Sequence, residues 1–499
     1  MTEKSSYRTI LRSSSIMGAA SIFNILAGIV KMKAAAVLLG PAGVGLVGLF
    51  QNLVQTAATV GALGFGSVGT RQVAAAHADG DKTSVVRVRR ALFWGSLALS
   101  IFSTLIFWSS SGLIATHLLH APELDQDVAW LALAVGLTIA AGSQGALLTG
   151  MRQIGDVARV QLLSSLAGAA LGILALWLWG SNGILALVLV APLSAFLAGH
   201  LYVSRLGRVE APKTRFGALA REWQSMARLG VAFMLSGLVT MGGHLAVRSL
   251  VQQELGAGAL GQFQAAWSIG MMYLGFVLGA MGTDYYPRLA AIIKDHQSAT
   301  RLVNEQTEVA LLLCGPVLLA MLALAPYVIR LLYSAEFLPA VEILRWQLLG
   351  DILKVMSWPL GFVLLAAGAG KTFIVTETTG IGVFVAATWV LLPLMDISAT
   401  GVSFLALYLC YLPMVWWLAR RRIGFRWSAV VTRQALMLLA VAGSVAGSAR
   451  ISETLAMAVG LVAALLIGVY AFARLEQMAE LGGSVRRLAR ISRRIFGNG

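Results

Sequence analysis

Charge is scarce in this sequence. Only 12% of its 499 residues are charged, whereas soluble proteins carry about a quarter. Hydrophobic residues make up 58% of the chain, and the mean hydropathy is +0.79. Apolar runs of about 18 residues or more recur from end to end, which is the pattern of membrane-spanning helices. The composition excludes a soluble protein and predicts an all-α polytopic membrane protein.

Cysteine is also scarce, and the signatures of catalysis are missing. The two cysteines, Cys314 and Cys410, fall within apolar runs, so a disulfide framework is excluded. No Walker motif, HExxH helix, metal-ligand cluster or Gly-x-Ser-x-Gly turn is present. We therefore expect no enzyme, no cofactor and no metal site. The polar N-terminus MTEKSSYRTILRSSS argues against a cleaved signal peptide.

Fourteen apolar stretches are long enough to span a membrane. They are expected at about 14–38, 43–67, 91–111, 128–150, 157–180, 183–203, 228–251, 260–284, 309–333, 340–367, 373–394, 399–419, 430–450 and 454–474.

The basic residues of the chain are distributed unevenly across this topology. The net charge of +16 is compatible with nucleic-acid binding, but all but seven of the 38 Lys and Arg fall on one side of the predicted membrane. The positive-inside rule makes that side cytoplasmic, so both termini are expected in the cytoplasm. The opposite loop HLLHAPELDQD contains neither Lys nor Arg. We expect membrane lipids and no nucleic acid as partners.

The chain contains an internal repeat. When the sequence is displaced by 216 residues, Gly40 falls on Gly256, Gly45 on Gly261 and Gly66 on Gly282 without a gap. Glycine is abundant, with 53 residues, so single matches carry little weight. Matches in the loops as well, such as Asp79 with Asp295, favour a true repeat.

The offset encloses six spans, so the two copies share one orientation in the membrane, as in parallel-repeat transporters. We predict two six-helix lobes related by a pseudo-twofold axis and followed by two further helices. The expected domains are an N-lobe over 1–204, a cytoplasmic linker over 205–228, a C-lobe over 229–420, spans 13 and 14 over 421–475, and a basic cytoplasmic tail over 476–499. The tail either lies on anionic headgroups or is a solvated disordered segment.

Seven cations lie outside the cytoplasmic set. They are Lys31, Lys33, Arg248, Arg330, Arg345, Lys354 and Arg450. An ionisable side chain inside a span is a candidate functional group, because it is costly unless it faces a cavity. Under the repeat, Arg248 falls between the positions of Lys31 and Lys33. Both lobes would therefore present a cation on their first helix, on two walls of a central V-shaped cavity.

Snorkelling to the outer interface is the alternative for each of these cations. Lys31 lies about 25 Å along its span at 1.5 Å per residue, within reach of that interface. Lys31 and Lys33 point about 200° apart on a helix, so both cannot face one cavity equally. Lys31 is the stronger candidate of the two.

Other polar groups also fall within spans. They are Asn24, His244, Asp284, Arg345, Asp351, Lys354 and Glu377. Asn24 and His244 are candidate substrate contacts, although a lone histidine is commonly packed against a neighbouring helix. Asp284 is expected beside a cytoplasmic loop and Arg345 near the outer interface.

Two carboxylates are candidates for coupling transport to H⁺ or Na⁺. Asp351 and Lys354 are three residues apart and are expected either to pair on one helix face or to line a cavity. Glu377 either titrates with a coupled proton or lies at the inner interface.

The charge of the expected central cavity indicates a class of substrate. Cations on both walls suit an anion, because Lys and Arg bind phosphate oxygens through charge-assisted hydrogen bonds. An exporter of organic cations would instead need acids there.

Two segments resemble a known family. These are LLGPAGVGLVGLFQNL after a first span that carries lysine, and GFGSVGTRQVAA at the end of span 2. They are similar to the polysaccharide flippases of the multidrug/oligosaccharidyl-lipid/polysaccharide exporter (MOP) superfamily. Within that superfamily the chain looks most like the O-antigen and enterobacterial-common-antigen flippases of Wzx type. Lipid II flippases are a weaker match, because an acid follows their basic residue in span 1, where this chain has Met32.

The resemblance implies alternating access and an undecaprenyl-pyrophosphate-linked oligosaccharide that moves from the inner to the outer leaflet. It also implies a polysaccharide polymerase and a chain-length regulator as partners. Two other interpretations stay open: a drug or small-molecule antiporter of the same fold, and a membrane glycosyltransferase, ligase or polymerase. The antiporter would need a buried acid that binds the driving cation, and the enzyme would need a long external loop.

Overall fold

The computed structural model describes residues 3–78, 82–206 and 216–481, and every element in these ranges is a helix. The middle of the predicted linker and most of the predicted tail lie outside the described residues. The helices are α1 (Glu3–Gly61), α2 (Phe65–Ala78), α3 (Lys82–Ser109), α4 (Ser111–Leu113), η1 (Ile114–Leu118), η2 (Pro122–Leu124), α5 (Asp125–Gly150), α6 (Ile154–Trp179), η3 (Gly180–Asn182), α7 (Gly183–Ser204), α8 (Phe216–Ile292), α9 (His296–Leu332), η4 (Ala335–Phe337), α10 (Ala340–Ala366), α11 (Gly370–Met395), α12 (Ser398–Ile423), α13 (Ala429–Ala449) and α14 (Glu453–Leu481).

The apolar runs form the long helices of this chain. Ten described helical segments are long and apolar enough to cross a membrane, or eleven with the bent pair in α8. Three of these eleven segments contain a break, at Gly40, at Gly180–Asn182 and at Gly256. Dividing the segments at these breaks reproduces the fourteen predicted spans, so the predicted fold class is confirmed.

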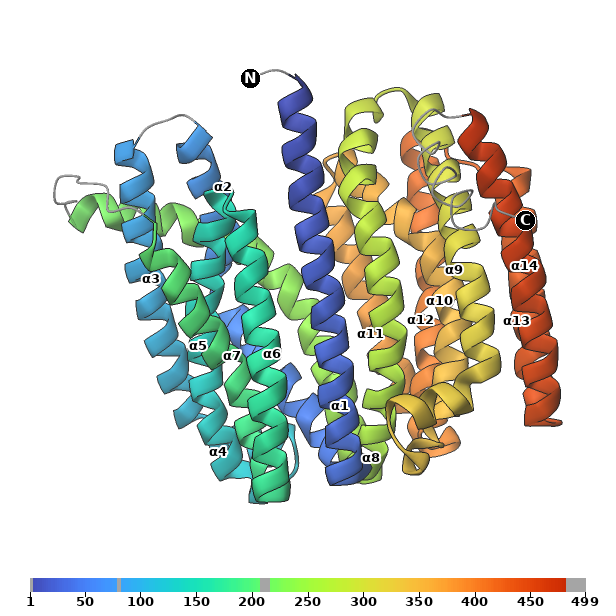
Figure 1. Cartoon of the computed structure of the whole chain (residues 1–499), viewed down its shortest axis with the longest axis horizontal. Coiled ribbons are helices and arrows are strands. Elements are labelled where there is room, and N and C mark those ends of the chain that lie inside the picture. Colours follow the sequence, from blue (N-terminus) through green and yellow to red (C-terminus); the bar gives the residue numbers. More distant parts are fainter. Residues whose placement is uncertain (1–2, 79–81, 207–215, 482–499) are drawn as a thin grey trace. The chain divides into compact units, whose positions relative to one another are not determined.

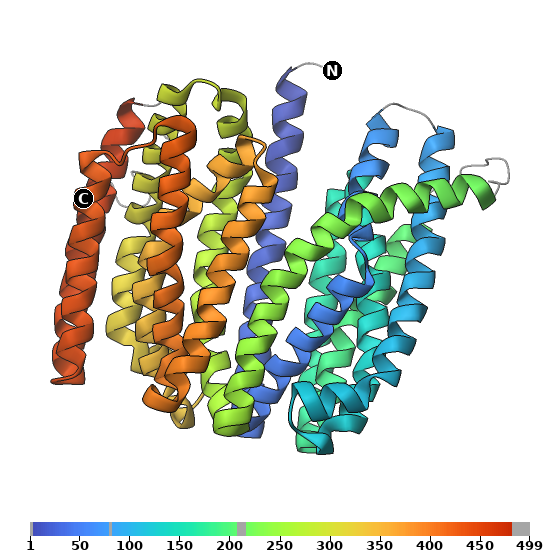
Figure 2. The same ribbon diagram turned by 180° about the vertical axis from the view of Figure 1, so that it is seen from behind.

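The breaks at Gly40 and Gly256 have the same backbone geometry. Their φ and ψ angles are 64° and −168° at Gly40, and 81° and −179° at Gly256. This region of backbone space is almost restricted to glycine, which explains why the sequence repeats glycine there. Figure 2 shows the chain turning back at the foot of α1, after its descent from the N-terminus.

Equivalent positions of the two repeats lie against each other near these breaks. A Cβ added to Gly45 would lie 2.7 Å from the backbone nitrogen of Gly261, and one added to Gly48 would lie 2.4 Å from the side chain of Gln264. Both pairs are separated by 216 residues. Contact between equivalent positions is what a twofold axis between the repeats produces.

The helices gather into two compact units. Unit 1 comprises Met1–Gln264 and Leu332–Glu336, and unit 2 comprises Ala265–Leu331 and Phe337–Gly499. The helices labelled α1 to α7 in Figure 1 belong to unit 1, and those labelled α10 to α14 belong to unit 2. The domain boundaries drawn from the sequence stay a prediction.

Unit 1 has a buried apolar core where α2, α3, α5 and the start of α8 meet. Phe65, Leu92, Leu147 and Met226 are among its members. The Trp223 indole donates a hydrogen bond to the Ala91 carbonyl at 2.8 Å, which fixes α8 against α3.

Unit 2 is built around α10, which packs against α11, α12 and α13. Trp267 of α8 stacks on Phe384 of α11 and meets Phe404 of α12 edge-on. Arg474 of α14 forms an ion pair with Glu308 of α9 at 2.9 Å, so the last helix is docked in this unit.

Candidate functional site

Lys31 is a half-buried cation in the apolar part of α1. It forms no hydrogen bond or ion pair within the described residues. Asn24 lies seven residues earlier and therefore on the same helix face, and its buried Oδ1 atom has no hydrogen-bond partner in the described part of the chain. The two side chains form a polar strip whose hydrogen-bonding capacity is unused.

Lys33 has a protein partner. Its ammonium donates a hydrogen bond to the carbonyl oxygen of Tyr333, just after α9. Lys33 therefore helps to hold the 332–336 segment on unit 1. This difference from Lys31 agrees with the opposite directions that the helix gives to the two side chains.

Arg248 is almost wholly buried, with 4% of its surface exposed. Its guanidinium donates to Gln264 Oε1 at 3.0 and 3.3 Å and to the His244 carbonyl at 3.2 Å. The Phe263 ring lies 5.5 Å away. Arg248 is thus held by internal contacts. His244 lies one turn before it and is half-buried on the same face of α8.

A second group of polar side chains lies inside unit 2. Asp351 of α10 is fully buried, and Tyr273 of α8 donates a hydrogen bond to its Oδ2 atom at 3.1 Å. Asp351 Oδ1 and both amide atoms of Gln347 are buried without a partner in the described residues. A Cβ added to Gly270 would lie 3.7 Å from both Asp351 Oδ2 and Gln347 Oε1. The glycine therefore leaves room beside the Asp351 carboxylate and the unsatisfied amide oxygen of Gln347.

Lys354 does not form the expected ion pair with Asp351. No nitrogen–oxygen contact within 4.0 Å joins them. The Lys354 ammonium instead contacts Met271 Sδ at 3.4 Å and lies 5.7 Å from the centre of the Phe404 ring. The Asp351 carboxylate and the Lys354 ammonium lie in the same part of unit 2, but they contact different residues of α8.

Glu377 of α11 is half-buried and accepts a hydrogen bond from the Tyr411 hydroxyl of α12 at 2.5 Å. Tyr411 was not recognised from the sequence. Its position relative to Glu377 depends on how α11 and α12 pack, and no local pattern records it.

Two other charged residues lie near the ends of their spans. Asp284 forms an exposed ion pair with Arg288 at 3.1 Å. Arg345 forms a bidentate pair with Glu453, at 2.5 and 3.0 Å, which joins the first turns of α10 and α14. A groove of about 760 Å³ opens beside this pair.

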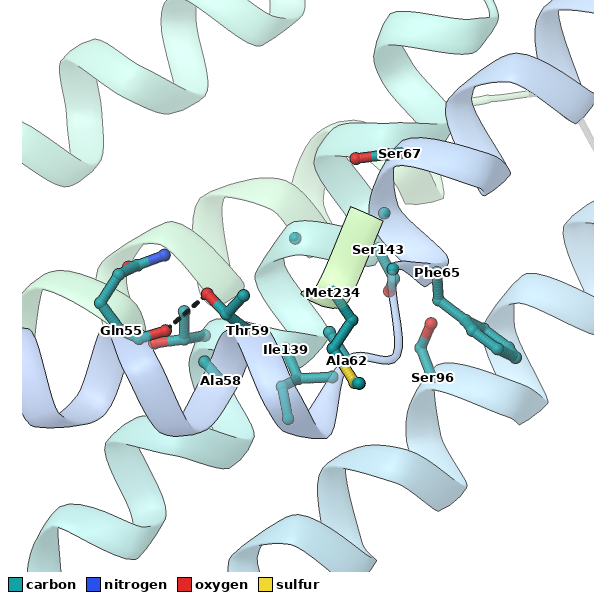
Figure 3. Close-up of a pocket in the computed structure, with 14 residues that line it drawn as sticks. Gln55, Ala58, Thr59, Ala62, Phe65, Ser67, Ser96, Ile139, Ser143 and Met234 are labelled. Atoms are coloured by element: carbon teal, nitrogen blue, oxygen red, sulfur yellow. Dashed lines mark hydrogen bonds between the residues drawn. The ribbon is translucent and has the colours of Figure 1, made fainter. Parts of the chain in front are cut away.

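A pocket of about 250 Å³ opens inside unit 1. Its walls come from α1, the 62–64 turn, α2, α3, α5 and α8, and we call it the hydroxyl pocket. Figure 3 shows Gln55, Thr59, Ser67, Ser96 and Ser143 around it, with Ile139 and Met234 between them. None of the fourteen residues that line it is charged. This pocket could not be predicted from the sequence, because Ser and Thr are ordinary residues in apolar helices.

Within the described residues, no group of three or more His, Cys, Asp or Glu is placed to hold a metal ion. The polar groups that the structure does bring together suit hydrogen bonding, anion binding and proton exchange.

The chain is similar to known membrane transport proteins. A family model described as "Polysaccharide biosynthesis protein" matches residues 10–293. The Lipid III flippases of Escherichia coli (strain K12) and Shigella flexneri are each 24% identical over 430 residues, which cover 83% of this chain and 100% of each flippase.

Two solved structures have a similar fold. The lipid II flippase MurJ, in an inward closed conformation, has a TM-score of 0.68 at 11% identity and covers 92% of this chain and 99% of its own. An inward-facing multidrug resistance MATE family transporter of the MOP superfamily has a TM-score of 0.68 at 15% identity and covers 81% and 94%. At these identities the likeness shows the fold alone.

Proposed function

Because this chain belongs to the polysaccharide biosynthesis protein family, we propose that it is a flippase for a lipid-linked oligosaccharide. Its similarity to the Lipid III flippases over their whole length supports this activity. The proteins that it matches are flippases and transporters, and we assign the chain no enzymatic activity. Its spans place it in a membrane as a multi-pass protein.

The observation that supports the proposal most directly is the position of Lys31 in the apolar part of α1. A cation inside an apolar span costs roughly 3 kcal/mol on insertion scales, and no partner for Lys31 among the described residues offsets this cost. An anionic ligand offsets it, because an ammonium binds phosphate oxygens through charge-assisted hydrogen bonds. We assign Lys31, with Asn24 beside it, to the pyrophosphate of an undecaprenyl-linked substrate.

The positive-inside rule puts the basic loops and both termini in the cytoplasm. The direction of transport is taken from the resemblance to the polysaccharide flippases, which implies movement from the inner to the outer leaflet of the bacterial inner membrane. A charged headgroup does not cross hydrocarbon unaided, because desolvating it is prohibitive. Alternating access around a polar site removes that barrier. A polysaccharide polymerase and a chain-length regulator stay predicted partners.

Coupling to H⁺ or Na⁺ is assigned to unit 2. Asp351 is buried with one unpartnered oxygen, and Glu377 is held by a neutral hydroxyl. Coupling requires that a carboxylate bind H⁺ or Na⁺ with a different affinity in each conformation of the transporter. The affinity of a buried carboxylate depends on the groups around it, so either residue meets this requirement if its surroundings change during transport. In proteoliposomes with an imposed pH or Na⁺ gradient, Asp351→Asn or Glu377→Gln should remove the gradient dependence of transport. Gradient-driven transport that survives in both variants would exclude these carboxylates as the coupling groups.

Transport across liposomes tests the proposed function directly. A fluorescent lipid-pyrophosphate oligosaccharide is reconstituted with the protein, and its arrival in the opposite leaflet is measured. We expect transport by the native protein and at least about tenfold slower transport by Lys31→Met, which corresponds to about 1.4 kcal/mol of lost interaction.

Lys33→Met is the matched control. It makes the same substitution two residues away, at a lysine whose hydrogen bond is to the protein. Transport by folded Lys33→Met should stay close to native. Equal rates in native protein and Lys31→Met would leave Lys31 as an interfacial anchor. Absence of transport by the native protein would remove the flippase assignment.

A small-molecule antiporter is the second candidate. The buried carboxylate of Asp351 favours it, because such a group binds a driving cation, and the fold is shared with a multidrug transporter. Gradient-driven efflux of a fluorescent organic cation from the same liposomes, together with no movement of the lipid, would favour the antiporter.

A further inference from the structure

The hydroxyl pocket of unit 1 has an uncharged polar lining. Hydroxyl and amide groups line it from several helices, and no acid or base faces it. A phosphate would find no cation there, and an organic cation would find no carboxylate. Burying either ion without a partner is costly. The ligand class that remains is a neutral molecule with hydrogen-bonding groups.

Most of the hydroxyls in this pocket already donate their proton. Thr59, Thr138 and Ser143 donate to carbonyls of their own helices, at 2.7, 2.7 and 2.8 Å. Their oxygens therefore meet the pocket as hydrogen-bond acceptors. A ligand that matches them has hydroxyl groups able to donate.

The hydroxyls of Ser67 and Ser96 make no such bond within the described residues. Of these two residues, Ser96 is the buried one. It is 2% exposed, and its Oγ atom has no hydrogen-bond partner among the residues that the structure describes. Leaving a buried hydroxyl unpaired costs about 1–3 kcal/mol. The amide of Gln55 also makes no hydrogen bond within the described residues. The pocket is therefore incomplete without an occupant.

Apolar side chains also line the hydroxyl pocket, among them Ala58, Ala62, Phe65, Ile139 and Met234. A lining that mixes polar and apolar groups suits a sugar ring, which has hydroxyls at its edge and C–H bonds on its faces. The volume of about 250 Å³ is below the range of about 300–1,000 Å³ for drug-sized ligands, so it holds a single ring rather than a chain.

We propose that the hydroxyl pocket binds one sugar residue of the oligosaccharide during transport. This deepens the proposed function and rests on it: Lys31 takes the charged pyrophosphate, and a separate neutral site takes part of the glycan. The pocket would therefore contribute to selection among glycans that share the same lipid carrier.

The glycine at position 142 provides the sharpest test. Gly142 lines the pocket, and a Cβ added to it would meet nothing within 4 Å. Gly142→Val therefore fills the pocket without a backbone clash. Gly145→Val is the matched control, because Gly145 lies on the same helix, also faces open space and is outside the pocket. Gly64 is unsuitable, since a Cβ there would lie 2.4 Å from the Gly230 carbonyl oxygen.

Two probes separate the sugar site from the pyrophosphate site. One is a lipid pyrophosphate that carries a trisaccharide, and the other is the same lipid pyrophosphate without sugar. Two or three hydrogen bonds of about 0.5–1.5 kcal/mol each should make the native protein bind the first probe at least about tenfold more tightly. In Gly142→Val this preference should disappear while the affinity for the sugarless probe stays native. Gly145→Val should behave as the native protein.

Ser96→Ala supplies a second measurement. Since the Ser96 hydroxyl has no partner in the empty pocket, its removal should not lower the thermal stability, yet it should weaken binding of the trisaccharide probe. Native preference for the trisaccharide in Gly142→Val would overturn the sugar site and leave the flippase standing. A native protein that neither transports nor binds either probe would overturn the proposed function and the sugar site with it.

Discussion

Gly40 and Gly256 break their helices with nearly equal backbone angles, yet the cations about two turns before them have opposite surroundings. Arg248 is buried and bonded to Gln264, whereas Lys31 has no partner in the described residues. The two repeats have kept the backbone turn and diverged in the chemistry of the preceding helix. Steric fit at the turns constrains both copies alike, while a paired cation serves the fold and an unpaired one remains available to a ligand.

The largest effect is expected where the two turns meet. In Gly261→Ala the added Cβ would lie 1.8 Å from the Pro41 carbonyl oxygen. Backbone atoms on both sides prevent relief, so we expect a loss of roughly 3 kcal/mol or more. The free energy or midpoint of thermal unfolding in detergent, together with the monodisperse fraction on size exclusion, measures it.

Gly258→Ala is the control for this substitution. It lies three residues away on the same helix, and its added Cβ would meet nothing within 4 Å. It should be neutral or slightly stabilising, because alanine favours helix over glycine. Equal stability of Gly258→Ala and Gly261→Ala would contradict the close contact between the repeats.

Methionine at the two cation positions should separate their roles. Met32 already occupies the position equivalent to Arg248 in the first repeat. Arg248→Met would remove the buried hydrogen bonds to Gln264 Oε1 and to the His244 carbonyl, and we expect a loss of about 1–3 kcal/mol of stability. Lys31→Met should keep or raise the stability, because it removes a cation that has no partner within the described residues. Thermal unfolding of both purified variants measures the difference.

Transport per folded molecule should show the reverse order. Arg248→Met should retain it and Lys31→Met should lose it. A stable but inactive Arg248→Met would show that this arginine contacts the substrate, and the contrast between the repeats would then fail.

The fourteen spans and the cations within them could be predicted because each depends on residues that are close in the sequence. The repeat could be predicted because the same residues recur in the same order 216 positions later. The partners could not. Gln264 lies 16 residues from Arg248 beyond a helix break, Tyr333 lies 300 residues from Lys33, and hydropathy does not specify which helix faces meet. Apolar runs predict that a helix spans the membrane, but they do not determine how the helix is rotated about its own axis.

Asp351 and Lys354, which we expected either to pair or to line a cavity, show what local spacing leaves open. Three residues apart, they satisfy the rule for a side-chain pair on one helix. In the folded unit, a tyrosine on α8 supplies the hydrogen bond to Asp351, and Met271 with the ring of Phe404 surrounds the lysine. Tertiary partners outweigh a pairing worth only about 0.2–0.5 kcal/mol.

A smaller effect is expected from alanine at the two helix breaks. The backbone region that both glycines occupy costs a non-glycine residue about 1–3 kcal/mol, so Gly40→Ala and Gly256→Ala should both lower the thermal stability. Gly40→Ala should cost more, because its Cβ would lie 3.0 Å from Glu336 Oε2, whereas the Cβ at position 256 would meet nothing within 4 Å. Adding Glu336→Ala should remove the difference. A neutral Gly256→Ala would refute the backbone explanation of the repeated glycine.

The smallest effect is expected at Asp295, which falls opposite Asp79 in the repeat and precedes α9. Its Oδ1 atom accepts a hydrogen bond from the Ser298 backbone amide at 3.2 Å. Hydrogen bonding from the side chain and then the backbone of Ser298 lowers the pKa of Asp295 below its usual value of 3.8. A depressed carboxyl pKa stabilises the fold above the unfolded-state pKa, and this contribution is lost as the pH falls through the folded-state pKa. Asp295→Ala should therefore lower the unfolding midpoint slightly at pH 7, and this difference should shrink as the pH falls below about 4 and disappear below the folded-state pKa. A difference that persists unchanged in acid would show that the side chain stabilises α9 by packing rather than by its charge.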